Sequence, residues 1–356
     1  MIQKKMIRLG LLGCGRVAEH YKFIIDNYKL SNCKVTSVCD LKLNRAIEFG
    51  KHFSCNFYID LNEMLKIESI DLLLILTPSG LHFEHAKKAL EAGVNVIVEK
   101  PITMITDEAI ALKNLANQKN KMYGCVFQNR MNPCIQKLKE TIDQGRFGKI
   151  ITRTVRLRWC RHQNYFDDGW HGTWKNDGGV INQQAIHHVD ILKWTGGSIE
   201  DVCGIAAKRL NKLEAEDTFV AILKFKDGAL GTIEATTAAR PQDIEASLSI
   251  IGEKGYAEIG GIALNKVEKW HFLDPIPDDE NIFRDFNQII PNGYGLSHGP
   301  FLQSAINNLS LNNIQPPVDV NDSIETLKLI HSLYASVELK RWVSMSEGLT
   351  SSKLGR

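Results

Sequence analysis

The feature that most constrains the fold is an apolar run near the start of the chain that breaks at two glycines. After residues 8–12 the chain reads Gly-Cys-Gly-Arg-Val-Ala over residues 13–18. This pattern predicts a strand that turns sharply into a helix, because Gly13 permits the turn and Gly15 lets the main chain approach a ligand. A helix that begins at Arg16 and Val17 directs its unpaired N–H groups and positive dipole end at phosphates. The turn therefore predicts a dinucleotide site, and these four residues are its candidate contacts.

A carboxylate follows at the end of the next β-rich segment, residues 34–40, about 20 residues beyond the turn. Asp40 at this position would accept hydrogen bonds from ribose hydroxyls and repel a 2′-phosphate. We therefore expect NAD as the cofactor, with NADP disfavoured rather than excluded because Lys42 and Arg45 lie nearby in sequence. The alternative role for Asp40 is the N-cap of the next helix.

Length and composition narrow the class of protein. A chain of 356 residues is long for one domain, so two are expected. The net charge of +2 shows no preference for nucleic acid or a membrane surface, and we expect neither as a partner. The eight cysteines lack the spacing of metal ligands and are interpreted as free, mostly buried thiols, with no metal site. Without an apolar stretch of signal or membrane length, the protein is expected to be cytoplasmic.

Strand-like and helix-like segments alternate through the first part of the chain. The segments are a strand at 70–76, a helix at 82–92 closed by Gly93, a strand at 94–98, a helix near 106–117 and a strand near 122–127. This alternation predicts a doubly wound parallel sheet, a Rossmann domain over residues 1–127. The loops after the strands lie along the ligand-bearing edge of such a sheet. Thr77, Pro78, Glu99 and Lys100 lie on these loops and are predicted to line the cofactor.

From residue 150 onward, short β-rich segments predict a large, mainly antiparallel sheet. They cover 150–157, 202–208, 218–225, 229–235 and 246–251. A long aromatic and polar insertion, 158–194, separates the first two segments, and insertions of this length are typically functional. We predict an α+β domain over residues 128–356 for substrate binding and oligomerisation. The helical segment 323–342 is expected to pack either there or back on the first domain.

Lys100 is the first candidate for chemistry. It follows a buried strand and precedes Pro101, which restricts the backbone of Lys100. A lysine at this strand end would lie near the nicotinamide, where partial burial and the charge of the oxidised ring would lower its pKa towards a useful range. The alternative is a solvated loop lysine paired with Glu99.

His187 is the second candidate. On a helix it would share a face with Asp190, three residues later, whereas the adjacent His188 would point elsewhere, to the surface or into packing. We therefore assign His187 to the site. A hydrogen-bonded core histidine is the alternative.

These features, in this order, resemble the glucose-fructose oxidoreductase/inositol dehydrogenase (Gfo/Idh/MocA) family. The resemblance rests on the glycine turn, Asp40, Thr77-Pro78 with His82, Glu99-Lys100-Pro101, and Gly-Gly followed by His187 and Asp190. It implies a Rossmann domain, a second domain on a large antiparallel sheet, hydride transfer between a sugar or polyol carbon and a nicotinamide, and often a tetramer. It further implies that His82 belongs to the cofactor site, that Lys100 lies by the reacting hydroxyl, and that His187 acts as acid or base.

One position departs from the family pattern. Gln183 stands four residues before His187, where the resemblance implies an aspartate. A neutral amide can orient an imidazole but does not stabilise an imidazolium by charge. We therefore assign more of the proton transfer to Lys100 than to His187.

Further motifs resemble the branch of this family that oxidises the C3 hydroxyl of UDP-linked N-acetylglucosaminuronate. Through this resemblance the candidate substrate-binding residues are Arg158, Tyr165, Trp170, Trp174, Asn182, Gln183, His187, Tyr294 and His298. Arginines at 156, 158 and 161 are candidate donors to a pyrophosphate or carboxylate, and Tyr165 or a tryptophan is a candidate for stacking on the uracil. In the alternative interpretation the arginines form a solvated sheet face and the tryptophans pack.

The sequence thus predicts an NAD-dependent dehydrogenase that converts a nucleotide sugar to its 3-keto form and assembles as a homotetramer. A polyol or inositol-type dehydrogenase, or a ketosugar reductase, is the alternative enzyme. A non-catalytic dinucleotide-binding sensor is the alternative from another class.

Overall fold

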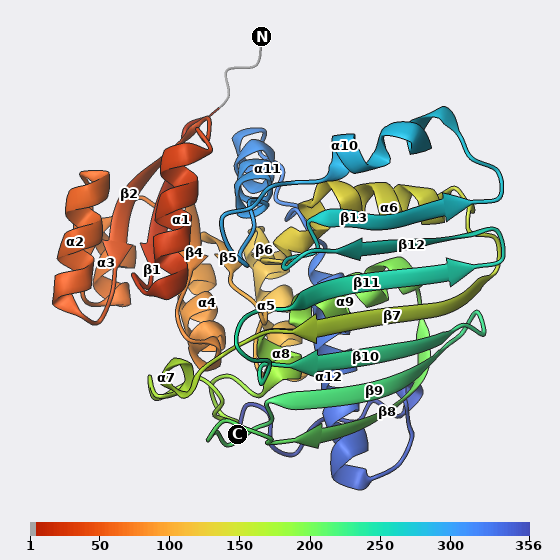
Figure 1. Ribbon diagram of the computed structural model, residues 1–356. Coiled ribbons are helices and arrows are strands. Elements are labelled where there is room, and N and C mark those ends of the chain that lie inside the picture. The colour runs from red at the N-terminus through yellow and green to blue at the C-terminus, as the bar shows by residue number, and fades with distance from the viewer. Residues whose placement is uncertain (1–4) are drawn as a thin grey trace. The chain divides into compact units, whose positions relative to one another are not determined.

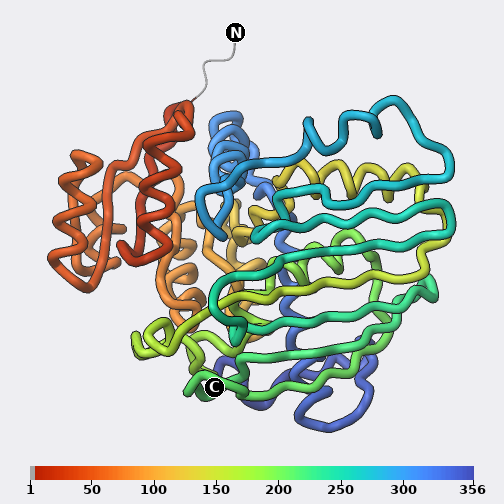
Figure 2. The backbone as a smooth tube through the Cα atoms, in the orientation of Figure 1, coloured from red at the N-terminus to blue at the C-terminus, as the bar shows by residue number. Residues whose placement is uncertain are grey.

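The computed structural model describes residues 5–356, which form two compact units (Figure 1, with the backbone path in Figure 2). The first unit contains the described residues up to Val126 together with Leu296–Ile324, and the second contains Phe127–Gly295 and Glu325–Arg356. Leu296–Ile324 was predicted for the second domain and belongs to the first unit instead. Its helix α11, His298–Ser310, packs on α1, Arg16–Asn27, and Gly299 lies so close to the ring of Tyr28 that a Cβ would collide with it.

The first unit is built on a parallel six-stranded sheet with the strand order β3-β2-β1-β4-β5-β6, which confirms the predicted Rossmann domain. Its strands are β1 Ile7–Leu12, β2 Cys33–Cys39, β3 Asn56–Tyr58, β4 Leu72–Ile75, β5 Asn95–Val98 and β6 Tyr123–Cys125. Nearly every side chain of β1 and β4 is buried, as in a sheet covered on both faces. The strand order reverses at β1 and β4, which is where ligands bind in doubly wound sheets.

Helices connect these strands in the predicted alternation. They are α1, α2 Leu43–Phe53, α3 Leu61–Ile67, α4 His82–Glu91 and α5 Thr106–Lys119, with the short 3₁₀ helix η1 at Ser79–Leu81. Gly93 has a φ of +77° and follows the end of α4, as expected for a glycine that closes a helix. The three-residue strand β3 was not predicted, because it is too short and too exposed to carry a periodic pattern.

The second unit contains an eight-stranded sheet in the order β13-β12-β11-β7-β10-β9-β8-β14. The strands are β7 Ile150–Arg158, β8 Ile199–Ala207, β9 Thr218–Phe225, β10 Leu230–Thr236, β11 Glu245–Gly252, β12 Gly255–Gly260, β13 Lys266–Phe272 and β14 Val343–Ser344. Strand pairs are antiparallel except for β7 with β10, which are parallel. The insertion after β7 acts as a crossover connection, so β8 enters the sheet parallel to β7.

Helices lie against one face of this sheet. They include α6 Pro133–Asp143, α9 Ile186–Gly196 and the second-unit part of α12, Val320–Leu339 (Figure 1). Along β7, Val155 and Leu157 are buried on the side of α9, while Arg156 and Arg158 alternate to the other side. Among the described residues of the second unit, no helix covers that other face. From Glu325 onward α12 belongs to the second unit, one of the two placements considered for this segment.

The cysteines are all free thiols. Cys14, Cys39, Cys125 and Cys134 are buried, while Cys33, Cys55, Cys160 and Cys203 are half-buried, so burial is less general than the sequence suggested. Within the described part of the chain, no helix combines the length and the apolar character needed to cross a membrane.

Candidate active site

The glycine turn joins β1 to α1 at the point where the strand order of the first unit reverses. Gly13 has a φ of +95°, and a Cβ there would come within 2.9 Å of the main chain of Leu76. Gly15 is the N-cap of α1, and no side chain caps this end of the helix. A Cβ on Gly15 would meet only the guanidinium of Arg45, at 3.8 Å. The turn therefore needs Gly13 for its conformation and leaves the helix N-terminus accessible to a phosphate.

Asp40 lies beside this turn, held by two main-chain donors. Its Oδ2 accepts the N–H of Cys14 at 2.8 Å, and its Oδ1 accepts the N–H of Lys42 at 2.7 Å. The N-cap of α2 is Lys42, so the alternative assignment of Asp40 as a helix cap is wrong. The bond to Cys14 links the carboxylate directly to the phosphate-binding turn. Asp40 thus has the position required of a carboxylate that binds an adenosine ribose.

Thr77 and Pro78 follow β4, and the imidazole of His82 joins their loop to the one after β5. His82 is fully buried, with Nε2 2.9 Å from the carbonyl oxygen of Thr77 and Nδ1 2.7 Å from that of Pro101. Burial lowers the pKa of His82, although both carbonyls act in the opposite direction. Because both ring nitrogens face main-chain carbonyls, His82 braces the loops, and its place in the cofactor site stays a prediction.

Glu99 and Lys100 occupy the loop that follows β5, the strand next to β4. Lys100 is half-buried, and its main-chain N–H donates to Oε2 of Glu99 at 3.2 Å. The carboxylate of Glu99 is 7% exposed and also accepts the hydroxyl of Tyr21 at 2.9 Å. Its burial contradicts the alternative of a solvated Glu99–Lys100 surface pair, and the placement of Glu99 along the cofactor stays a prediction.

His298 was predicted to bind substrate and is found in the first unit instead, beneath the Lys100 loop. It is 2% exposed, and its Nε2 lies 3.7 Å from Oε1 of Glu99. Burial raises the pKa of Glu99, but the nearby His298, the charge of Lys100 and the hydroxyl of Tyr21 together lower it to about 2. His298 is thus a buried neighbour of Glu99, and its predicted contact with substrate stays a prediction.

In the second unit, α8 Val180–Gln183 and α9 carry Asn182, Gln183 and His187, and all three side chains are buried. His187 is 9% exposed and packs edge-on against the ring of Phe127, with centroids 5.9 Å apart. His188, on the next position, is fully buried against Trp159, and burial lowers its pKa to about 3. His188 therefore packs in the interior. This was one of the two positions predicted for it, the other being the surface.

A carboxylate that the sequence analysis did not single out, Asp177, organises this cluster. Its Oδ1 accepts the side-chain amide of Gln183, and its Oδ2 accepts the N–H of Gly172 at 2.6 Å. The amide of Asn182 donates to the carbonyl oxygen of Asp177 at 2.7 Å. A negative charge is therefore present next to position 183, although residue 183 itself is neutral. Its sequence signal was the Asp-Gly-Gly run just before α8.

Asp190 shares α9 with His187, but its charge is compensated elsewhere. Its two oxygens accept the guanidinium of Arg130 at 2.7 and 2.8 Å, and Oδ1 also accepts the hydroxyl of Thr326 at 2.9 Å. Arg130 and Asp190 are both buried. This bidentate pair anchors α9 inside the second unit.

Among the aromatic residues of the insertion, Tyr165, Trp170 and His171 form a cluster, and Trp174 packs separately. The hydroxyl of Tyr165 accepts the amide of Gln184 at 3.3 Å, and its ring lies 4.3 Å from that of His171, which in turn contacts Trp170 at 3.6 Å. Trp174 instead packs on Tyr334 at 5.3 Å, which favours the packing interpretation for this residue. Tyr294 is 38% exposed at the end of the second unit's first segment.

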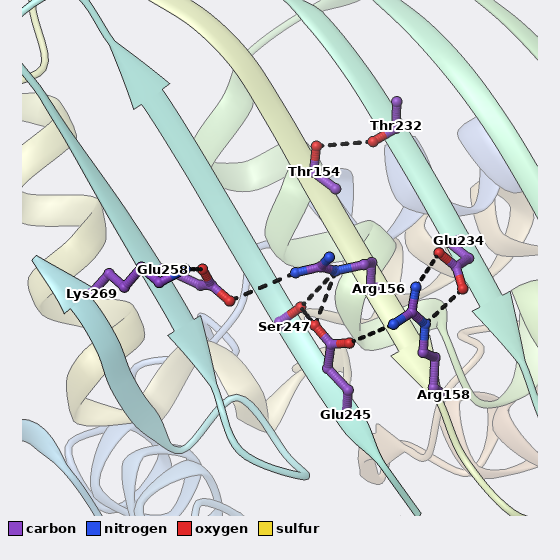
Figure 3. A network of polar contacts seen from close by, with 9 residues as sticks. All are labelled: Thr154, Arg156, Arg158, Thr232, Glu234, Glu245, Ser247, Glu258 and Lys269. Carbon is purple, nitrogen blue, oxygen red and sulfur yellow. Dashed lines mark hydrogen bonds and ion pairs between the residues drawn. The ribbon is translucent and has the colours of Figure 1, made fainter. Parts of the chain in front are cut away.

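Arg156 and Arg158 lie on the uncovered sheet face, where Figure 3 shows them among glutamates. Arg158 binds both oxygens of Glu234 at 2.7 Å and reaches Glu245 at 3.2 Å, and Arg156 lies 3.0 Å from Glu245. This face is opposite to the one that carries α9 and His187. The structure therefore corrects the assignment of Arg158 to the substrate and favours the alternative of a charged sheet face. Arg161, past the strand end, pairs with Asp243 at 2.9 Å.

The first unit thus carries a glycine turn at a helix N-terminus, a carboxylate beside that turn and a lysine at a neighbouring strand end. The second unit carries His187 and the cluster of Asn182, Gln183 and Asp177. Among residues 5–356, no group of three or more His, Cys, Asp or Glu side chains is arranged to hold a metal ion.

Comparisons with known proteins match both units. A family model described as "Oxidoreductase family, NAD-binding Rossmann fold" matches residues 7–127, and the "GFO/IDH/MocA C-terminal domain" matches residues 135–258. A solved structure of the WlbA dehydrogenase from Bordetella pertussis, in complex with NADH and UDP-GlcNAcA, has 34% sequence identity and a TM-score of 0.91, covering 97% of this chain and 99% of that one.

Two curated enzymes are more distant relatives. The scyllo-inositol 2-dehydrogenase (NAD(+)) of Bacillus subtilis is 27% identical over 78% of this chain and 82% of its own length. The D-glucoside 3-dehydrogenase of Escherichia coli is 25% identical over 71% of this chain and 77% of its own length.

Proposed function

The chain belongs to the GFO/IDH/MocA family of NAD-binding oxidoreductases, and we propose that it oxidises the C3 hydroxyl of UDP-linked N-acetylglucosaminuronate to a 3-keto sugar. The observation that carries this proposal is the similarity over nearly the whole chain to the Bordetella protein solved with NADH and UDP-GlcNAcA. The relative named a D-glucoside 3-dehydrogenase supports oxidation at C3.

The residues of the first unit fit NAD. A phosphate at the N-terminus of α1 meets no side chain in the helix cap, and Asp40 is fixed beside the turn by the N–H of Cys14. We assign Gly13, Gly15, Arg16 and Val17 to the pyrophosphate and Asp40 to the adenosine ribose. Thr77 and Pro78 line the same strand edge. When bound, NAD supplies the acceptor for the hydride from C3.

In the proposed mechanism Lys100, as the neutral amine, takes the proton of the C3 hydroxyl as the hydride leaves. Its loop is braced on one side by Glu99 and on the other by His82, so the amine starts from a defined backbone. We assign to His187 the second proton-transfer position and to Asn182 and Gln183 the orientation of the sugar. The bond from Gln183 to Asp177 fixes the direction in which this amide points.

The nucleotide part of the substrate is assigned to the aromatic cluster of the insertion. Tyr165 and Trp170 offer ring faces, and Tyr294 an exposed ring, for stacking on uracil. The guanidinium of Arg161 lies 5.8 Å from the ring centre of Tyr165 and is the basic group of this cluster. Stacking combined with a cation suits a uridine diphosphate.

A single-turnover experiment tests this function. Protein loaded with NAD is mixed with UDP-N-acetylglucosaminuronate, and we expect formation of NADH and a product two mass units lighter, formed once per site. Lys100→Met should keep NAD binding and slow hydride transfer by about a hundredfold or more, whereas the exposed Lys87→Met should be unchanged. Full turnover by Lys100→Met would contradict the assignment of the base. Because the oxidation is uphill against NAD, steady-state assays need a coupled acceptor.

A polyol dehydrogenase is the second candidate, favoured by the similarity to the scyllo-inositol enzyme. A panel of inositols, free hexoses and UDP sugars, assayed in both directions, separates it from the nucleotide-sugar enzyme and from a ketosugar reductase. Tight NAD binding with no hydride transfer to or from any member of the panel would instead indicate a sensor.

We also propose a homotetramer in which the uncovered sheet face pairs with the same face of a second copy. Ile205, Val220 and Ile222 form a continuous apolar area there, because Ile205 pairs with Val220 and Cys203 with Ile222 across β8 and β9. Beside it, the basic and acidic side chains compensate one another (Figure 3). Because the charges of this face are paired within it and an apolar area lies beside them, two copies of the same face can contact each other across a two-fold axis. The free cysteines suit the proposed cytoplasmic location.

A further inference from the structure

Two buried histidines lie below the Lys100 loop in the first unit, although 278 residues separate them in sequence. Nε2 of His20, on α1, lies 3.2 Å from Nδ1 of His298, the first residue of α11. Their rings meet edge to face at 4.7 Å, and the ring of Tyr21 meets that of His298 at 5.4 Å. His298 is therefore held on two sides by α1, and its remaining nitrogen faces Glu99.

The contact between His298 and Glu99 is electrostatic. Nε2 of His298 lies 3.7 Å from Oε1 of Glu99, beyond hydrogen-bond distance, and because a carboxylate offers only acceptor oxygens, the ring presents an N–H to it. The hydroxyl of Tyr21 donates to the same oxygen at 2.9 Å. The second oxygen, Oε2, accepts the main-chain N–H of Lys100 at 3.2 Å. One oxygen of Glu99 is thus used to fix the carboxylate and the other to hold the backbone of Lys100.

We propose that His298 is a positioning residue for Lys100 that acts through Glu99. Its ring N–H faces Oε1 and favours one rotation of the carboxylate by electrostatic attraction, so that Oε2 holds the backbone from which the lysine side chain projects. It also compensates part of the negative charge that Glu99 places next to the lysine. The proposal rests on the proposed role of Lys100 as proton acceptor.

The charges around Glu99 determine the direction in which the pH dependence of the rate is expected to move. The titratable groups facing it are Tyr21 on α1, His298 on α11, His82 on α4 and Lys100 in its own loop, with His20 behind His298. Without the polar ring of His298 near Oε1, the carboxylate is less compensated and holds the ammonium form of Lys100 more strongly. The rise of the rate with pH, which reports formation of the neutral amine, then moves to higher pH. Removing the charge of Glu99 moves this rise of the rate to lower pH.

The experiment measures single-turnover hydride transfer as a function of pH in the NAD-loaded protein, with UDP-N-acetylglucosaminuronate as substrate. His298→Phe keeps the ring and removes the donor, and we expect a rate near neutral pH about tenfold lower and a profile moved to higher pH. His298→Gln restores an N–H donor and should recover the rate to within about threefold. Glu99→Gln should move the profile the opposite way. His52→Phe, at a half-exposed site on α2, is the control and should match wild type.

Three results would overturn the proposal. One is a wild-type pH profile for His298→Phe, and another is a loss of stability in His298→Phe with no movement of the profile. The third is a change in the half-saturating sugar concentration alone, which would return His298 to the substrate site. Lys100→Met separates this failure from that of the proposed function: if it retains turnover, the assignment of the base fails, whereas if it loses turnover and His298→Phe behaves as wild type, only this inference fails.

Discussion

The hydroxyl of Tyr334, on α12, donates a hydrogen bond to Oε1 of Glu216 at 3.0 Å inside the second unit. The N–H of Ile181 donates to the same oxygen at 3.2 Å, while Oε2 has no hydrogen-bond partner among the described residues. Glu216 is 3% exposed. The buried carboxyl therefore joins α12 to α8, the helix that carries Asn182 and Gln183, next to a second carboxylate, Asp177.

We predict that Glu216 makes the second unit less stable as pH rises. Burial raises the pKa of Glu216 to about 8, and the charge of Asp177 adds to this effect. The folded state thus keeps a proton that the unfolded state has lost above its ordinary value of 4.5. Between these two values the free energy of unfolding should fall by up to about 1.4 kcal/mol per pH unit. Glu216→Gln should remove this fall, and the exposed Glu280→Gln should not, in urea unfolding followed at several pH values. Parallel pH curves for wild type and Glu216→Gln would contradict the prediction.

Gly179 is predicted to tolerate no side chain. A Cβ built on it collides with the carboxyl group of Glu216, and its φ of −104° is ordinary, so the constraint is one of space. Gly179→Ala should destabilise the protein by about 1–3 kcal/mol. Gly293→Ala, where the nearest atom would be 3.9 Å away, is the matched control. Adding Glu216→Ala to Gly179→Ala should recover part of the loss in thermal unfolding, and strict additivity would argue against this contact.

Asp40→Ala should weaken NAD binding roughly tenfold to a hundredfold, because the ribose loses a charged acceptor. The preference for NAD over NADP should shrink as well, since the carboxylate that repels a 2′-phosphate is gone. Calorimetric titration with both cofactors measures the two effects. Hydride transfer at saturating NAD should change little. An unaltered NAD affinity would mean that Asp40 serves only to close the turn through Cys14.

The buried pair of Arg130 and Asp190 should be necessary for the stability of the second unit. Arg130→Met leaves the carboxylate of Asp190 buried without its cation, at a cost of about 3–5 kcal/mol. Arg284→Met, which removes an exposed pair with Asp285, should leave the midpoint of urea unfolding unchanged. The double variant Arg130→Met/Asp190→Leu should recover most of the loss. A single variant as stable as wild type would refute this account.

The proposed subunit contact predicts the behaviour of a charge placed on the uncovered face. Ile222 is 47% exposed at the centre of the apolar area, and Ile222→Glu would bury an unpaired carboxylate in the contact. Light scattering coupled to size exclusion should show a lower mass for this variant. Ile289→Glu, at a loop position that is 95% exposed, should keep the mass of wild type. Equal masses for wild type and Ile222→Glu would exclude this face as the interface.

Local patterns were sufficient for much of the fold. The predicted strand at 218–225 coincides with β9, because apolar and polar residues alternate along it and one face is buried. The glycine turn was recognised because the left-handed φ of Gly13 has a cost that few other residues avoid. Strands β12 and β13 were not predicted, and no segment beyond residue 251 was recognised as β-rich.

The site was predicted less completely than the fold. Lys100 and Asp40 could be singled out because each follows a strand, and strand ends in a parallel sheet converge on one edge. The surroundings of Arg158 and His298 were not anticipated. Arg158 was assigned without knowing that Glu234 and Glu245 would lie on the neighbouring strands, and His298 without knowing that its helix joins the first unit.

The amino-acid sequence by itself determined the alternation of strands and helices in the first unit, the glycine turn and the identity of the chemical groups, because these depend on residues close together along the chain. Only the tertiary structure decided which polar side chains become partners: His298 with Glu99, and Gln183 with Asp177. Such pairings depend on which segments the packing of the core brings together, and the chemistry of a single side chain does not specify its partner.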